Sequence, residues 1–147
     1  MERMDTLLQQ SQHTRPSIAT LLRTAVSLTF AGEDHRADTV EDLLHVLRRH
    51  GRTPRTRDLN SAVRSLSQDP STAHAALAGV LHLSIDRKTR AVPPDLATFH
   101  VAMQAAGRAG KAELGLSLLE QMREEGLEPT AVTMDITRGL LGDRPSS

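Results

Sequence analysis

Apolar residues recur every three or four positions along most of the chain, a pattern typical of helices that bury one face. The clearest example is the segment 94–130, in which two such runs flank a turn that contains Gly107 and Gly110. The second run ends at Gly126, and Pro129 prevents its continuation. No useful stretch alternates with a period of two. The pattern therefore predicts an all-α chain, with helices near 17–31, 38–50, 57–68, 71–84, 96–108, 111–125 and 131–141.

The pair of helices is repeated along the chain. A shift of 35 residues places Pro129 and Thr133 where Pro94 and Thr98 stand. A shift of 75 residues in the other direction aligns 37–51 with 112–126, and a middle unit starts at Pro54. A fixed period of this length is the signature of a repeat protein. The prediction is an N-terminal arm (1–16), a helical region (17–141) divided into units 19–53, 54–93, 94–128 and a partial unit 129–141, and a tail (142–147).

The best-defined unit carries landmark residues in a fixed order: Pro94-Asp95, Thr98-Phe99-His100, Ala109-Gly110, Gly115-Leu118-Leu119-Met122 and Gly126-Leu127-Glu128-Pro129. In these residues it resembles a pentatricopeptide repeat (PPR), and weaker similarity extends over residues 19–141. Gly115 replaces the usual Ala, His100 replaces the usual Asn, and the middle unit has five extra residues. The tetratricopeptide repeat is the alternative, but its early Trp and Leu-Gly pair are missing. The resemblance implies a right-handed α-solenoid of helix-turn-helix repeats.

In the PPR family, two polar side chains per repeat read one RNA base. Carried over, this implies pairs of Ala25 with Arg55, Asn60 with Asp95, and His100 with Thr130, and Asp135 begins a fourth pair. Asn60 and Asp95 look most like a base-reading pair of the family, of the kind associated with uracil. The alternative is that Asn60 is a solvent-facing helix residue and that Asp95 caps the helix after Pro94.

Charge points to a second candidate for RNA contact. The chain has 18 basic and 18 acidic residues, and this zero net charge argues against a strong, independent nucleic-acid binder. The charges are nevertheless clustered, because one segment holds six arginines against one acid: Arg48, Arg49, Arg52, Arg55, Arg57 and Arg64. These arginines could bind phosphates. The alternatives are a solvated surface or pairing with the acidic segment 33–42. A smaller patch, Arg87, Lys88 and Arg90, is expected to be solvated.

Other chemistry finds little support in the sequence. No cysteine is present, so disulfides, thiolate zinc sites and cysteine nucleophiles are excluded. The seven histidines lack metal-ligand spacing, no Gly-rich phosphate loop follows a strand, and no apolar stretch of about 20 residues suggests a membrane span. We therefore expect no enzyme, metal, cofactor or small-molecule substrate. The first 30 residues faintly resemble an organelle transit peptide, although Glu2 and Asp5 dilute that pattern.

These features lead to one functional expectation and two alternatives. We expect a non-catalytic subunit of an organellar ribonucleoprotein, because the chain resembles this family, its array is short and its net charge is zero. The leading expectation is a mitochondrial ribosomal protein that contacts rRNA and neighbouring proteins. The chloroplast is the alternative compartment. A protein–protein scaffold without RNA contact is the second hypothesis. A small RNA-binding factor for organellar transcripts is the third, and it is weakened by the presence of only one usable base-reading pair.

Overall fold

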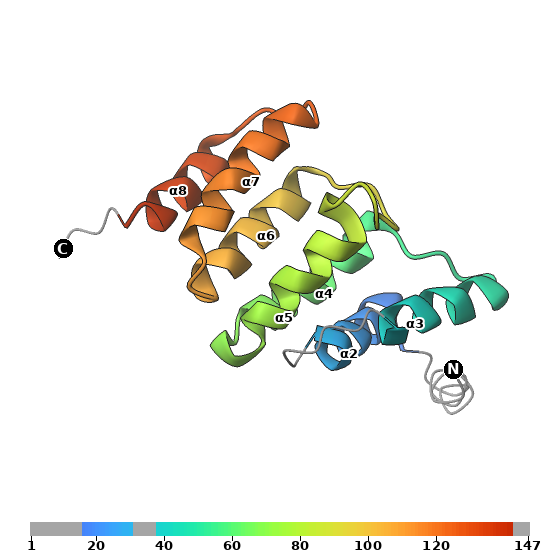
Figure 1. Ribbon diagram of the computed structural model, residues 1–147. Coiled ribbons are helices and arrows are strands. Elements are labelled where there is room, and N and C mark those ends of the chain that lie inside the picture. Colours follow the sequence, from blue (N-terminus) through green and yellow to red (C-terminus); the bar gives the residue numbers. More distant parts are fainter. Residues whose placement is uncertain (1–15, 31–37, 143–147) are drawn as a thin grey trace.

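The computed structural model of the chain describes residues 16–30 and 38–142 (Figure 1). All regular secondary structure in these residues is helical, as the apolar spacing predicts. The predicted arm and tail, and residues 33–37 of the acidic segment, lie almost wholly outside the described residues. The α-helices are α2 (Ile18–Phe30), α3 (Asp38–Arg49), α4 (Thr56–Ser67), α5 (Pro70–Val80), α6 (Leu96–Arg108), α7 (Ala112–Glu124) and α8 (Ala131–Leu140), and a π-helical turn η1 (Leu81–Ile85) follows α5.

Side-chain caps define where several helices begin. Asp95 is the N-cap of α6, where its carboxylate accepts from the Thr98 N–H at 2.9 Å, and the Thr98 hydroxyl accepts from the Asp95 N–H in return. Thr130 and Thr133 form the same capping box at the start of α8, 35 residues later. Helix α5 is capped by Asp69, whose carboxylate accepts from the Ser71 N–H at 2.9 Å.

Consecutive helices pair into hairpins, and the hairpins follow one another along the molecule. Figure 1 shows α2/α3, α4/α5 and α6/α7 in succession, with α8 after the third hairpin. We call α2, α4 and α6 the first helices of their hairpins, and α8 follows them as the next first helix. Each first helix packs on the next one, so that α2, α4, α6 and α8 form a row. Helix α5 also packs on the first helices before and after its own hairpin. The architecture is therefore all-α and like that of helical repeats.

The turns that follow α6 and α7 depend on glycine. Gly110 and Gly126 adopt φ angles of +75° and +82°, which side chains strongly disfavour. Both lie just after a helix end, as the sequence predicts. The core between the hairpins is aliphatic, and both phenylalanines of the chain, Phe30 and Phe99, are buried in it.

The five extra residues of the middle unit are absorbed by the turn η1 and the connection 86–93. The N–H groups of Ala91 and Val92 donate to the carbonyl of Leu83, which folds the connection back onto η1. Arg87 and Arg90 both bind the Glu125 carboxylate of α7, at 2.9 and 3.1 Å. The expectation that this basic patch is merely solvated is therefore wrong for these two arginines. They join the connection to the following hairpin.

One glycine sets the distance between hairpins. Gly79 of α5 faces α2, and a Cβ at this position would lie 2.5 Å from Cγ1 of the buried Val26. We predict that Gly79→Ala destabilises the protein by about 1–3 kcal/mol, because overpacking against a stiff β-branched side chain outweighs the better helix propensity of alanine. Urea unfolding followed by circular dichroism measures the change.

Gly139→Ala provides the matched control. This glycine is also helical, but a Cβ there meets nothing within 4 Å. It should therefore stabilise the protein by about 0.5–1 kcal/mol through helix propensity alone. Equal effects of the two substitutions would contradict the packing explanation.

Candidate functional site

The predicted base-reading pair of the middle unit is joined by a direct hydrogen bond. Nδ2 of Asn60, on α4, donates to Oδ1 of Asp95 at 3.0 Å, and the Thr98 hydroxyl donates to Oδ1 of Asn60 at 2.8 Å. Asn60 is only 6% exposed, so its interpretation as a solvent-facing residue is wrong. Asp95 does cap α6, as the alternative interpretation predicted. The structure thus brings the two residues together. We call the hydrogen-bonded group of Asn60, Asp95 and Thr98, which joins the consecutive first helices α4 and α6, the first bracket.

Hydrogen bonding in this bracket favours the charged form of Asp95. Burial by itself raises the pKa of its carboxyl group. The N–H of Thr98, the amide of Asn60 and the hydroxyl of Thr98 more than offset burial, and the net pKa lies below its ordinary value. The carboxylate is therefore a fixed acceptor that holds the start of α6 against α4.

A second bracket joins α6 to α8 in the same way. Nε2 of His100 lies 2.6 Å from the hydroxyl of Thr133, which also accepts from the Thr130 N–H at 2.9 Å. Thr133 stands 35 residues after Thr98, and both threonines are fully buried. The first predicted pair makes no such bracket, since Ala25 has no polar side chain and is fully buried.

The predicted arginine segment is divided by the fold. Arg48 and Arg49 lie in the last turn of α3, which is a second helix. Arg52 donates to the carbonyl of Pro16 at 3.0 Å, and this hydrogen bond links the segment after α3 to the segment before α2. Arg57 and Arg64 lie seven residues apart on α4, and both are exposed.

The remaining candidates of this segment have local roles. Arg55 is the N-cap of α4, and its N–H donates to the carboxylate of Asp58 at 2.9 Å. The acidic segment that was an alternative partner for the arginines is described only from residue 38, and there Glu41 contacts His82 at 2.9 Å. The structure therefore does not gather the six arginines into one site.

Tertiary structure gathers a different set of arginines. Arg23 of α2 donates to the hydroxyl of Ser65 at 3.3 Å, and Arg108 of α6 donates to the carbonyl of Ser67 at 2.8 Å. Both guanidinium groups therefore reach the C-terminal end of α4, where Arg64 is exposed. Within the described residues none of these three arginines forms an ion pair. We call Arg23, Arg64 and Arg108 the arginine cluster.

Sequence reasoning named Arg64 as a candidate but missed Arg23 and Arg108. Arg23 and Arg108 are 85 residues apart and belong to different units, and neither lies in a basic run. Their contacts with the serines of α4 depend on how neighbouring first helices are staggered. One available signal was that each is a single cation on the polar side of a first helix.

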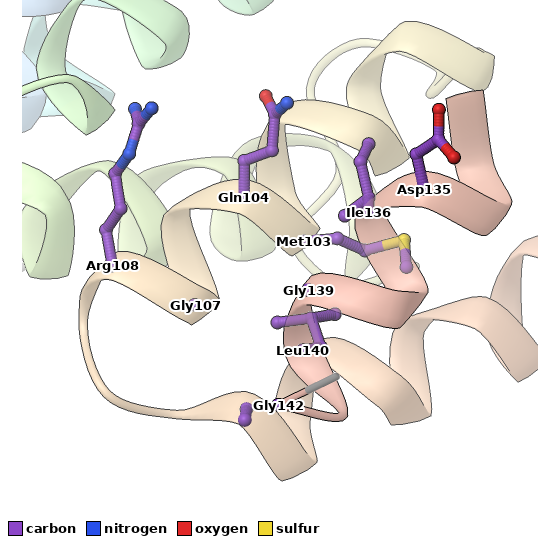
Figure 2. A pocket seen from close by; sticks show the side chains of 10 residues that line it. Met103, Gln104, Gly107, Arg108, Asp135, Ile136, Gly139, Leu140 and Gly142 are labelled. Carbon is purple, nitrogen blue, oxygen red and sulfur yellow. The ribbon is translucent and has the colours of Figure 1, made fainter. Parts of the chain in front are cut away.

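An open groove that Arg108 helps to line lies between α6 and α8 (Figure 2). Its volume is about 660 Å³. Gln104, Arg108 and Asp135 extend from the helices at its rim, whereas Met103 and Leu140 lie lower, between the helices. The groove thus combines a polar rim with an apolar floor. It has the chemistry of a binding surface, and it lacks a nucleophile–base pair.

The part of the chain that the structure describes contains no group of three or more His, Asp or Glu side chains arranged to hold a metal ion. No helix there has both the length and the apolar character needed to cross a bilayer.

The sequence matches no model of a known protein family, and no curated protein matches it either. The resemblance to pentatricopeptide repeats therefore stays a prediction.

The first bracket makes a prediction about stability. Asn60→Ala removes a donor to Asp95 and the buried acceptor of Thr98, and should destabilise the protein by about 1–2 kcal/mol. Chemical unfolding measures this loss. The neighbouring Ser61, which is exposed, supplies the control Ser61→Ala, expected to stay within about 0.5 kcal/mol of wild type. An unchanged stability for Asn60→Ala would show that the bracket is not structural.

The second bracket makes a prediction about pH. Burial lowers the pKa of His100 below its ordinary 6.5 and outweighs the opposing effect of Asp95. At this side chain the unfolded chain therefore binds a proton more readily than the folded chain as the pH falls through 6.5, and the contribution of His100 to stability decreases on acidification. We expect the loss of unfolding free energy between pH 7.5 and 5.5 to be smaller in His100→Asn than in wild type. Identical pH profiles would refute the assignment.

Proposed function

We propose that the chain is a non-catalytic helical-repeat protein that contacts RNA through the row of its first helices, as a subunit of an organellar ribonucleoprotein. The arginine cluster carries this proposal. The proposal includes a right-handed PPR-like solenoid, with the first helices lining the RNA-binding face. Mitochondrial ribosomal RNA is the expected ligand, on the basis of the resemblance.

The arginine cluster suits a phosphate backbone. Arg23, Arg64 and Arg108 come from three successive first helices and are exposed. A guanidinium group has five N–H donors, so the single bonds of Arg23 and Arg108 to α4 orient these groups and leave further donors for phosphate. By contrast, Arg87 and Arg90 are both paired with the carboxylate of Glu125. Cations that lack an acidic partner contribute most to phosphate binding.

The brackets favour contact with the RNA backbone over reading of bases. The Asn60 amide bonds both Asp95 and Thr98, and the His100 ring bonds Thr133. A base that used these groups would have to replace bonds that hold consecutive helices together. We therefore propose weak sequence preference, as in a subunit whose position is set by a larger assembly.

Salt dependence tests the proposal. The full chain is titrated into a labelled single-stranded 20-nucleotide RNA, and fluorescence anisotropy is followed from 25 to 200 mM salt. The double variant Arg64→Gln/Arg108→Gln should bind more weakly at low salt. Its slope of log affinity against log salt should be shallower by about 1.4, because each lost phosphate contact removes about 0.7 on a single strand.

The control removes two exposed cations that lie away from the first helices. Lys88→Gln/Arg123→Gln makes the same change in net charge, in the connection 86–93 and in α7. It should retain a slope close to that of wild type. Equal slopes for the two double variants would contradict the role of the arginine cluster, and absence of binding by wild type at 25 mM salt would contradict RNA contact.

A further inference from the structure

The rim of the groove between α6 and α8 carries a cation, an amide and a carboxylate. The side chains of Arg108, Gln104 and Asp135 follow one another in the view of Figure 2 and extend to the same side. Gln104 and Arg108 are four residues apart on α6, so they share one face of this helix and lie about 6 Å apart along its axis. The groove therefore offers an ordered set of hydrogen-bonding groups at one open edge.

These three groups have hydrogen-bonding capacity left. Gln104 is exposed, and its amide makes no hydrogen bond to any described residue. Arg108 donates to the carbonyl of Ser67 and keeps further donors. Asp135 contacts Arg138 through Oδ1 at 3.4 Å, and both side chains are more than half exposed, so this surface ion pair is weak and Oδ2 remains an acceptor.

Below the rim, apolar side chains form a floor and glycine keeps space open. Met103 is fully buried, and Ile136 and Leu140 are partly buried. Gly139 also lines the groove, and a Cβ there would meet nothing within 4 Å. The volume of about 660 Å³ falls within the range of about 300–1,000 Å³ that is common for ligand sites. This combination fits a flat ring with apolar faces and a polar edge.

The groove differs from the two brackets, whose polar groups are bonded to one another. The second bracket joins α6 to α8 through His100 and Thr133, whereas the groove is lined from Met103 and Asp135 onward. A base can therefore enter the groove without replacing a hydrogen bond that holds consecutive helices together. Sequence preference in such an array comes from one position.

Given the proposed RNA contact, on which this site depends, we infer that the groove binds one base of the RNA and prefers adenine. The amide of Gln104 matches the Hoogsteen edge of adenine, because its oxygen accepts from N6 and its nitrogen donates to N7. The carboxylate of Asp135 accepts the second hydrogen of N6, and Arg108 binds the adjoining phosphate. Uracil and guanine present the carbonyl oxygens O4 and O6 in place of this amino group, and cytosine covers less of the apolar floor.

RNA titrations test the preference. Fluorescence anisotropy of the full chain is measured with labelled oligo(U) and with the same RNA carrying a central run of adenines. Wild type should bind the adenine-containing RNA at least about fivefold more tightly, the lower end of what one bidentate contact to a base contributes. Gln104→Ala removes the amide and Gly139→Leu fills part of the groove, so each should abolish most of this preference.

Binding to oligo(U) separates this site from the arginine cluster. Both variants keep the cluster, so their affinity for oligo(U) and its salt dependence should equal those of wild type. Ser61→Ala changes an exposed polar residue of α4 and should retain the adenine preference. Gly139→Leu should keep the wild-type circular dichroism spectrum, because the new side chain enters open space and leucine favours a helix.

Two outcomes would overturn the base site and leave the proposed RNA contact intact. One is equal binding of the two RNAs by wild type, and the other is an adenine preference that survives in Gly139→Leu. Absence of binding to either RNA would contradict the RNA contact and the base site together.

A mononucleotide locates the site without a phosphate backbone. The ¹⁵N-labelled chain is titrated with AMP or UMP, and amide chemical shifts are followed by NMR. AMP should cause saturable shifts at Gly107, Gly139 and Gly142, which line the groove, and UMP should shift them less. Shifts confined to the surroundings of Arg23 and Arg64 would mean that the phosphate alone is bound, and would overturn the base site.

Discussion

The hydrogen bond between a polar residue of one first helix and the capping threonine of the next is the interaction on which the arrangement of this protein depends. Thr98 and Thr133 each close the capping box of their own helix and also contact the preceding first helix, through Asn60 and His100. A single hydroxyl therefore determines both where a helix begins and where it lies relative to its neighbour. Because these hydroxyls are fully buried, leaving one without a partner is costly, and the register between units is well determined.

This use of polar residues complements a small apolar core. The hairpins pack mostly through Leu, Val and Ala, and Gly79 and Gly115 let helices approach closely where a methyl group would collide with Val26 or Leu140. At Gly115 a Cβ would lie 2.9 Å from Cδ1 of Leu140, so the glycine leaves room for this side chain of α8. Small residues thus determine the separation of the helices, while the brackets determine their stagger.

The stagger in turn decides what the surface presents. It brings Arg108 to the C-terminal end of α4, and it places Gln104 of α6 and Asp135 of α8 along the same groove. Met134 of α8 is exposed, whereas Phe99 at the corresponding position of α6 is fully buried.

The sequence by itself determined the helices and their order. Apolar spacing, glycine after helix ends and the proline landmarks are local signals, and the bounds they predicted differ by few residues from those observed, apart from the π-helical turn at Leu81–Ile85. Only the tertiary structure decided which polar side chains form hydrogen bonds or ion pairs inside the fold and which remain available to a ligand. Asn60 is buried in a bracket, Arg90 is paired with Glu125, and Arg23 joins a cluster with residues of two other units. The physical reason is that burial and pairing depend on the distances between neighbouring units, which helical periodicity within one unit does not contain.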